Sequence, residues 1–491
     1  MQRLSRRTLD TVPAGVILPP EAALEAEIGI VHLGLGAFHR GHQALLTQRA
    51  LAVQPGAWAI SGASLRSAAM PAALRPQDCL YSVIENDGVL EEATIVGSVR
   101  EALLAAGDGE VLLARIAAPS TRIVTLTVTE KGYCHNPATG DLDLAHPEIM
   151  ADLLGQAPPQ STLGWLVRGL DRRRQGCAGG LTVLCCDNMA SNGRTLRRLV
   201  EQFAGIVDPS LATWIAEEVR FPSSMVDRIV PAATPAALDH ACGLLGVRDA
   251  AAVSCESFAQ WVIEDDFAAG RPAWDAAGAE LVRDVGPYQD LKLRLLNGAH
   301  SAIAYIGALL GLPFVSDVMA EPGLAGFVER LMLDEIAPLT APPVGCDVNA
   351  YGQALLRRFA NASLQHRTLQ IAMDGSQKIP VRWLPVLRQG LRQGLACPRL
   401  VTSIAVWFQF LTGVDETGRE LPLDDPLAGR LRAMAAPSAS DPTSAVQALL
   451  SVEEVFGRDL REHVDLARRL ATALRQIGNL GLRATLSSVE G

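Results

Sequence analysis

One segment near the N-terminus restricts the fold more than any other, because an apolar strand runs there into a glycine turn and then into an amphipathic helix. It reads IGIVHLGLGAFHRGHQALL from residue 28, with Gly34 and Gly36 in the turn. Since glycine has no Cβ, the chain can turn tightly, and a pyrophosphate can approach the backbone at the helix N-terminus. The segment therefore predicts the start of a dinucleotide-binding parallel sheet. The cofactor contacts expected along it are Gly34, Gly36, Ala37, Phe38 and His39.

The segment and the next strand depart from the usual dinucleotide motif in two places. The third position of GxGxxG is His39, and the next glycine is Gly41. The second expected strand ends in Ser64-Leu65-Arg66, where such domains usually place a carboxylate that accepts from the adenosine ribose. An arginine there can accommodate a 2′-phosphate instead. Arg66 is therefore a further candidate cofactor contact, and both NAD and NADP stay open.

Apolar periodicity divides the chain into an α/β part and a helical part. Short strands, separated by helical segments such as His42–Ala52, are expected at Ile28–Leu33, Ala57–Leu65, Arg122–Val128 and Leu181–Cys186. Three- and four-residue apolar spacing predicts later helices at Tyr288–Leu310, Gly323–Ile336, Tyr351–Phe359, Val401–Leu411 and Val464–Ile477. The sequence thus predicts an N-terminal Rossmann-type parallel-sheet domain over residues 1–285, followed by a mostly α-helical domain over residues 286–491. A strand and loop are expected within 221–235, and a loose loop at Ala435–Ser444.

Charge and hydropathy exclude several classes of protein. Lys+Arg number 43 and Asp+Glu 53, so the net charge is −10 and no diffuse basic field exists for a nucleic acid or an acidic membrane surface. The longest apolar run, Ser301–Val315, falls short of the roughly 20 residues of a spanning helix. The N-terminus lacks the apolar stretch of a signal peptide, so a cytoplasmic location is expected. Nine cysteines without a CxxC pair or zinc-ligand spacing predict reduced thiols and no metal site.

Lysine is rare in this chain, which makes its positions informative. Only three of the 43 basic residues are lysine, namely Lys131, Lys292 and Lys378. Arginine supplies positive charge but stays protonated, whereas a lysine can exchange a proton or act as a compact donor. The three lysines are therefore candidates for a chemical role.

The segment DLKLRLLNGAH at residues 290–300 places a lysine, an amide and an imidazole on one expected helix. Lys292, Asn297 and His300 fall at about 0°, 140° and 80° around a regular α-helix, so they can share one broad face. A buried lysine with a depressed pKa can exchange a proton with an alcohol or a carbonyl oxygen during hydride transfer. Asn297 can hydrogen-bond the developing oxyanion, and His300 can orient the lysine or the substrate. A helix with a snorkelling lysine and satisfied polar neighbours is the structural alternative.

Two further polar groups lie at the ends of apolar runs. Asn188 follows the strand that ends at Cys186, and the carboxyl ends of parallel strands are where α/β sheets present catalytic groups. It offers a second amide donor. Asp227, within SSMVDR, can accept from sugar hydroxyls or serve as a hydrogen-bonded carboxylate at the edge of the core.

Two other kinds of site have weaker support. A metal site made of His32, His39 and His42 lacks a nearby carboxylate or cysteine to complete its ligands. A nucleophilic Cys185 or Cys186 lacks a paired histidine, so these thiols are expected to pack in the core.

With these residues assembled, the sequence resembles the polyol-specific long-chain dehydrogenase/reductase family, also called the mannitol dehydrogenase family. The resemblance covers nearly the whole chain. Its motifs, in order, are HLGLGAFHRGHQA at 32–44, LTVTEKGY at 126–133, CDN at 186–188, MVDRIVP at 225–231, KLRLLNGAHS at 292–301 and DGSQKIP at 374–380. It implies an N-terminal Rossmann-type domain, a largely helical C-terminal domain, and an active site between them that works without zinc.

The resemblance also implies roles for single residues. These are acid/base for Lys292, oxyanion donors for Asn188 and Asn297, positioning for His300, and substrate contacts for Asp227 and Lys378. The mannitol branch typically carries an arginine eight residues before the lysine that corresponds to Lys378. Here that position is Gln370, and the nearby cation is Arg367, which becomes a second candidate to bind a substrate carboxylate. Family members often have glutamate three residues before the catalytic lysine, where this chain has Gln289.

Segments 221–235, 260–275 and 366–380 are most similar to the branch that interconverts D-fructuronate and D-mannonate. The resemblance thus implies an NAD-dependent, reversible reduction of D-fructuronate to D-mannonate. A mannitol 2-dehydrogenase or another polyol dehydrogenase is the alternative, and a non-catalytic dinucleotide-binding regulator is a remote one. The expected partner is a small hexuronate or polyol. The sequence does not fix the oligomeric state, and a monomer is the working expectation.

Overall fold

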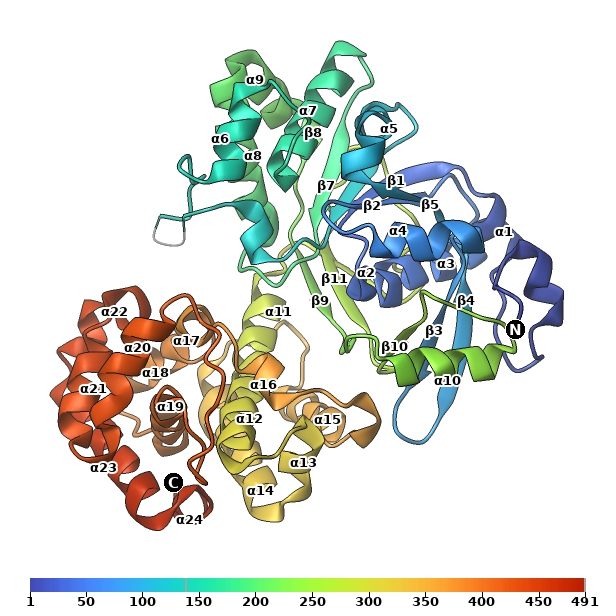
Figure 1. Ribbon diagram of the computed structural model, residues 1–491. Coiled ribbons are helices and arrows are strands. Elements are labelled where there is room, and N and C mark those ends of the chain that lie inside the picture. The colour runs from blue at the N-terminus through green and yellow to red at the C-terminus, as the bar shows by residue number, and fades with distance from the viewer. Residues whose placement is uncertain (137–138, 490–491) are drawn as a thin grey trace. The chain divides into compact units, whose positions relative to one another are not determined.

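The computed structural model describes residues 1–136 and 139–489, and the chain divides into two compact units, Met1–Gly286 and Pro287–Gly491 (Figure 1). Each unit has its own hydrophobic core. Across the described residues, no helix is both long and apolar enough to cross a bilayer. All nine cysteines are free thiols, and most of them are buried.

The first unit is built on a six-stranded parallel sheet with the strand order β5-β2-β1-β6-β7-β8. Its strands are β1 Ile28–Leu33, β2 Ala59–Ser64, β5 Val99–Leu104, β6 Ile123–Leu126, β7 Leu181–Cys185 and β8 Val219–Arg220. In chain order this is the 3-2-1-4-5-6 arrangement of dinucleotide-binding sheets, in which the winding reverses between β1 and β6. All four expected strands are present, and the predicted Rossmann-type domain is confirmed.

Helices cover both faces of this sheet, because successive side chains of a buried strand point to opposite sides. The helices of the first unit are η1 Arg6–Thr11, α1 Glu21–Glu25, α2 Ala37–Gly41, α3 Gln43–Val53, α4 Ala69–Leu74, η2 Arg75–Gln77, α5 Ala105–Ala117, η3 Glu130–Tyr133, α6 Pro147–Leu154, α7 Thr162–Gln175, α8 Asn192–Val207, α9 Pro209–Glu218 and α10 Pro235–Leu245. In β1, Val31 and Leu33 pack in one hydrophobic cluster with α5, α7 and α8. Ile30, on the opposite side, packs in a second cluster with α3.

The first unit also contains two three-stranded sheets, ordered β10-β3-β4 and β12-β11-β9. Their strands are β3 Tyr81–Asn86, β4 Glu91–Val96, β9 Ser224–Asp227, β10 Val253–Cys255, β11 Gln260–Glu264 and β12 Glu280–Val282. Strand β9 confirms the strand expected within residues 221–235. Its antiparallel pairing with β11 sets Asp227 opposite Gln260.

The second unit is helical, as predicted. Its elements are α11 Gly286–Leu291, η4 Lys292–Leu296, α12 Asn297–Leu310, α13 Val315–Ala320, α14 Pro322–Arg330, η5 Leu331–Ile336, η6 Ala337–Leu339, α15 Val348–Phe359, η7 Ala362–Leu364, α16 Thr368–Ile371, α17 Gly375–Arg382, α18 Leu384–Arg392, α19 Pro398–Phe410, α20 Ala428–Ala435, η8 Ala436–Ala439, α21 Pro442–Leu450, α22 Glu453–Arg461, α23 Val464–Leu480 and α24 Leu482–Ser488. Tyr305 lies at the centre of its aromatic core, with its ring 6.1 Å from that of Trp383 and 6.5 Å from that of Trp407.

Three local predictions in the second unit are wrong. The single α-helix expected over Tyr288–Leu310 is interrupted by the π-helical segment η4 between α11 and α12. The single α-helix expected over Gly323–Ile336 changes at Leu331 from α14 into a second π-helical segment, η5. The loop expected at Ala435–Ser444 is largely helical, because η8 follows α20 directly and α21 starts at Pro442. The side chain of Asp441 accepts from the amide of Ser444 and caps α21, and a proline fits the first helical position.

Candidate active site

The turn after β1 has the backbone that its glycines predict. Gly34 has a φ of +102°, and a Cβ there would lie 2.1 Å from the carbonyl oxygen of Thr127, so only glycine fits. The amide of Gly34 donates to the carbonyl of Ala63 at 2.9 Å, which ties the turn to the end of β2. Among the described atoms, a Cβ on Gly36 would meet only the carbonyl oxygen of Gly34, 3.7 Å away. This open face fits the close approach of a pyrophosphate.

A pair of buried histidines lies beneath the turn. His39, at the third position of the glycine motif, stacks on His32 with ring centroids 3.4 Å apart. The two ring nitrogens of His32 lie 2.7 Å from Thr125 Oγ1 and 3.0 Å from the carbonyl oxygen of Gly34, so this ring braces the turn. Burial lowers the pKa of His32 to about 3 and the pKa of His39 well below its usual value, so both are neutral near pH 7. The nitrogens of two stacked rings do not converge on one ion. This argues against a metal site made of His32, His39 and His42.

The other expected cofactor contacts lie around the same turn. Ala37 and Phe38 form the first turn of α2 and are half-buried. Arg66 follows the end of β2, and its guanidinium pairs with the carboxylate of Glu148 at 2.8 Å. The sequence has no acidic residue at the end of β2, but the folded chain places the carboxylate of Glu148 beside Arg66 at this position.

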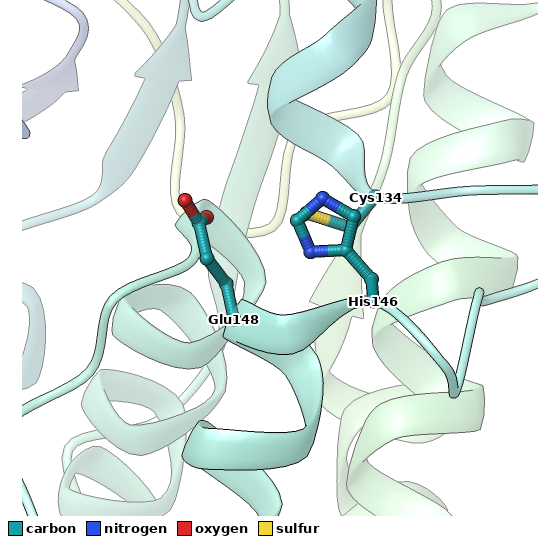
Figure 2. A group of neighbouring side chains, drawn as sticks. All are labelled: Cys134, His146 and Glu148. Atoms are coloured by element: carbon teal, nitrogen blue, oxygen red, sulfur yellow. The ribbon is translucent and has the colours of Figure 1, made fainter.

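Glu148 also belongs to a group of possible metal ligands that the sequence does not predict. The ligand atoms of Cys134, His146 and Glu148 all lie within 4.8 Å of one another, and the structure shows no second group of this kind in the residues it describes (Figure 2). Nδ1 of His146 is buried without a hydrogen-bond partner in the same part of the chain. The spacing, with eleven residues between cysteine and histidine, is not that of a zinc motif, which is why sequence reasoning missed the group.

The carboxyl end of β7 carries Asn188 and a carboxylate that sequence reasoning overlooked. Asp187 accepts hydrogen bonds from the amides of Val128 and Thr129, both at 3.0 Å, and from the hydroxyl of Tyr133 at 2.6 Å. Burial raises the pKa of Asp187, and these hydrogen bonds oppose that rise. Asp187 thus ties the end of β7 to the loop after β6. Asn188, the next residue, is exposed at this edge of the sheet.

A buried amide joins β7 to β9. The side-chain nitrogen of Asn192 donates to the carbonyls of Asp187 at 3.0 Å and Ser224 at 2.9 Å, and its oxygen accepts from the amide of Ser224 at 3.0 Å. This residue too was missed, because its partner Ser224 lies 32 residues away in β9. Asp227 ends the same strand and is 3% exposed. The hydrogen bonds between Asn192 and Ser224 hold the start of this strand.

In the second unit, the three residues expected on one helix are all buried. Lys292 starts the π-helical segment, and Asn297 and His300 lie in the first turn of α12, with exposed fractions of 5%, 7% and 6%. The wider π turn changes the angles expected for a regular α-helix, since each residue advances less around the axis. Such interruptions are frequent at functional sites.

His300 offers a free nitrogen in this segment. Its Nε2 is buried and has no hydrogen-bond partner within the described part of the chain. Burial lowers the pKa of His300 well below its usual value. The neighbouring basic groups His366, Arg358, Arg382 and Lys292 lower this pKa further. The imidazole is therefore neutral near pH 7. A buried, unsatisfied nitrogen is costly unless a ligand or water bonds it, so it indicates a binding position.

The start of α12 is held by the end of α17. The guanidinium of Arg382 donates to Ser301 Oγ at 2.9 Å and to the carbonyl of Asn297 at 3.2 Å. The indole of Trp383 donates to the carbonyl of Gly298 at 3.0 Å. Arg382 and Trp383 are therefore supporting residues, and sequence reasoning missed both.

The two cations expected to contact a substrate carboxylate lie on neighbouring elements. Lys378 of α17 is partly buried, and its ammonium donates to the carbonyl of Ile371 at 3.2 Å. Arg367 precedes α16 and is exposed, with its guanidinium 5.6 Å from the ring centroid of Phe314. Lys378 and Arg367 thus also stabilise the segments in which they lie.

The fold and these two sets of residues are those of a dinucleotide-dependent oxidoreductase. The model of the mannitol dehydrogenase Rossmann domain matches residues 28–276, and that of the mannitol dehydrogenase C-terminal domain matches residues 284–478. The chain belongs to the mannitol dehydrogenase family.

Individual relatives match over almost the full chain. The protein is 43% identical to the uncharacterized oxidoreductase YeiQ of Escherichia coli (strain K12), over 97% of each chain. It is 42% identical to the D-mannonate oxidoreductase of the same organism, over 94% of this chain and 96% of that protein. A solved structure, the ternary complex of Pseudomonas fluorescens mannitol 2-dehydrogenase with NAD and D-mannitol, superposes with a TM-score of 0.89 at 34% identity and covers 99% of each chain.

Proposed function

We propose that this protein catalyses the reversible reduction of D-fructuronate to D-mannonate with NAD as its cofactor. The observation that carries the proposal is the buried segment that holds Lys292, Asn297 and His300, whose Nε2 has no hydrogen-bond partner among the described residues. The choice of substrate is supported by the 42% identity to a D-mannonate oxidoreductase over 94% of this chain. In this proposal residues 1–285 bind the cofactor and contribute Asn188 and Asp227 to the substrate, whereas residues 286–491 supply the acid/base and the other contacts to the substrate.

The residues of the chain then divide the chemistry among them. When bound, a nicotinamide would supply a hydride to the ketone or accept one from the alcohol. Lys292 gives a proton to the substrate oxygen during reduction and takes it back during oxidation. The amides of Asn188 and Asn297 donate hydrogen bonds to that oxygen as its negative charge develops. The neutral His300 holds a substrate hydroxyl through its Nε2, which is buried and has no hydrogen-bond partner in the described part of the chain.

The remaining residues recognise the rest of the sugar. The carboxylate of Asp227 accepts hydrogen bonds from substrate hydroxyls. A buried carboxylate at the end of a strand can do this without a metal ion. Lys378 and Arg367 are the proposed partners of the uronate carboxylate, since this charge distinguishes fructuronate from fructose.

A mannitol 2-dehydrogenase is the second candidate. The superposition on the mannitol-bound Pseudomonas fluorescens enzyme favours it, because almost every residue of both chains is included. Product analysis separates the candidates. Incubation with NADH and D-fructuronate should yield D-mannonate and NAD⁺ in equal amounts, as followed by NMR. Reduction of D-fructose to mannitol without any reaction of fructuronate would establish the second candidate, and no turnover of either sugar would favour a dinucleotide-binding regulator.

Arg367→Ala tests the recognition of the substrate carboxylate. The variant should lower kcat/KM for fructuronate by a factor that corresponds to roughly 2–3 kcal/mol of transition-state binding, the value of a lost charge-assisted hydrogen bond. Reduction of fructose, which has no carboxylate, should change little. Steady-state rates with both sugars decide the matter, because an equal loss for the two would mean that Arg367 only supports its own segment against Phe314.

The reaction should not depend on a divalent metal. Lys292 and the two amides already supply the proton and the stabilisation of the oxyanion that a Lewis acid would provide. We expect fructuronate reduction to persist after exhaustive dialysis against a chelator, measured against an undialysed sample. Activity that is lost on chelation and returns with added Zn²⁺ or Mg²⁺ would contradict this expectation.

A further inference from the structure

Arg66 stands where dinucleotide-binding domains read the adenosine ribose. β2 lies next to β1 in the sheet, with Leu33 opposite Ala63. The carbonyl of Ala63 accepts from the amides of Gly34 at 2.9 Å and Leu35 at 3.3 Å, so the glycine turn rests on the end of β2. Arg66 follows three residues later. In this fold a carboxylate at the end of the second strand bonds the ribose hydroxyls, whereas an arginine nearby accommodates a 2′-phosphate.

The carboxylate that β2 lacks comes from a distant part of the chain. Glu148 lies in the first turn of α6, and its Oε1 is 2.8 Å from Nη2 of Arg66. The side chain of Arg66 is 71% exposed and that of Glu148 only 24% exposed, so the carboxylate is the better held of the two. The start of α6 is a favourable place for a negative charge, because the exposed amides of a helix N-terminus face it.

We propose that Glu148 makes the cofactor site selective for NAD over NADP by occupying Arg66. This inference rests on the proposed function, since it assumes a nicotinamide dinucleotide at the glycine turn. The carboxylate of Glu148 supplies acceptors for the ribose hydroxyls of NAD. The 2′-phosphate of NADP, with about two negative charges, meets a like charge there and finds the guanidinium already paired. Arg66 alone would favour the phosphate, because a free guanidinium grips it with two hydrogen bonds.

The same carboxylate is also part of the Cys134, His146 and Glu148 group, so a metal ion is the competing explanation for its position. A cation would have to displace the guanidinium of Arg66 from Glu148. It would also need the thiolate of Cys134, although burial raises the pKa of that thiol to about 11. These contacts favour the ion pair over a metal site.

The inference is tested by cofactor binding without any sugar substrate. NADH and NADPH are titrated into the wild-type protein and into Glu148→Gln, and binding is followed by nicotinamide fluorescence. The wild type should bind NADH at least about 10-fold more tightly than NADPH. In Glu148→Gln the affinity for NADPH should rise by roughly 10- to 100-fold, the factor expected for a freed charge-assisted contact, and should weaken steeply with added salt. The double variant Glu148→Gln with Arg66→Gln should lose this gain.

Matched controls make the result specific. Glu110→Gln breaks a surface ion pair of similar length, 3.0 Å to Arg172, and should leave both affinities unchanged. Cys134→Ser and a chelator should also leave the selectivity unchanged, and dependence on either would overturn the inference in favour of a metal site. Equal affinities of the wild type for the two cofactors, or an unaltered ratio in Glu148→Gln, would overturn it too. A protein that shows the expected selectivity but reduces no fructuronate would refute the proposed reaction and not the role of Glu148.

Discussion

Replacing Lys292 with alanine is expected to lower kcat for fructuronate reduction by about 10²–10⁴-fold, the usual cost of losing a general acid/base. The lysine is buried, starts the π-helical segment and lies close enough to His300 to help lower the pKa of that imidazole. Binding of NADH should not change, because the glycine turn and not this side chain is expected to hold the cofactor. Steady-state rates and a fluorescence titration of NADH measure the two quantities separately.

Two further variants define the role of Lys292. Lys292→Arg should fail to restore turnover, since a guanidinium stays protonated and does not exchange a proton near neutral pH. Arg294→Ala is the matched control, because this cation lies two residues later on the same segment and pairs with Asp290 at 2.8 Å instead. The control should keep most of its activity. Near-normal turnover in Lys292→Ala at neutral pH would show that another group exchanges the proton.

Substitution of the two turn glycines should give opposite patterns of stability and binding. Gly34→Ala should destabilise the fold by about 2–3 kcal/mol, because the residue has a positive φ and its Cβ would collide with the backbone of Thr127. Gly36→Ala should change the free energy of unfolding by less than about 1 kcal/mol, since nothing in the described structure crowds its Cβ. Gly36→Ala should nevertheless weaken the binding of NADH by at least about 10-fold, because the added methyl group would stand where the pyrophosphate approaches the backbone.

Chemical denaturation and NADH titration of both glycine variants provide the measurement. A stable Gly36→Ala protein that binds NADH as tightly as the wild type would place the cofactor elsewhere. A Gly34→Ala protein of normal stability would mean that the turn relaxes more readily than its contact with Thr127 indicates.

Four strands of the main sheet are predictable from sequence because each is a short apolar run that ends at turn residues. Strand β1, for example, begins and ends where the pattern places it. The other two were not predicted, because β5 contains Arg100 and Glu101 and β8 has only two residues. The π-helical segment at Lys292–Leu296 is not predictable in the same way, since its apolar spacing is that of an ordinary helix and the interruption depends on packing. The helix that starts at Pro442 was missed for another reason. Small residues indicated a loop, although Asp441 and the proline provide a helix start.

In the candidate site, too, some residues can be predicted from local sequence and others cannot. Residues that would do chemistry, such as Lys292 and Asn188, can be found from residue type and from their place at a helix or strand end. The residues that hold them depend on contacts across the chain. Asp187 bonds an amide 59 residues earlier, and Arg66 meets Glu148 82 residues later. No local pattern encodes such pairs, so sequence alone leaves the choice between NAD and NADP open.

The measurement that tests the central claim most directly is the ratio of kcat/KM for D-fructuronate to kcat/KM for D-fructose, determined with NADH on the wild-type protein. A site that binds a substrate carboxylate through Lys378 and Arg367 should discriminate against a sugar that lacks it, because the charge-assisted hydrogen bonds to that carboxylate are then not formed. We expect a ratio of at least about 100. A ratio near or below one would contradict the proposed function and identify the protein as a polyol dehydrogenase.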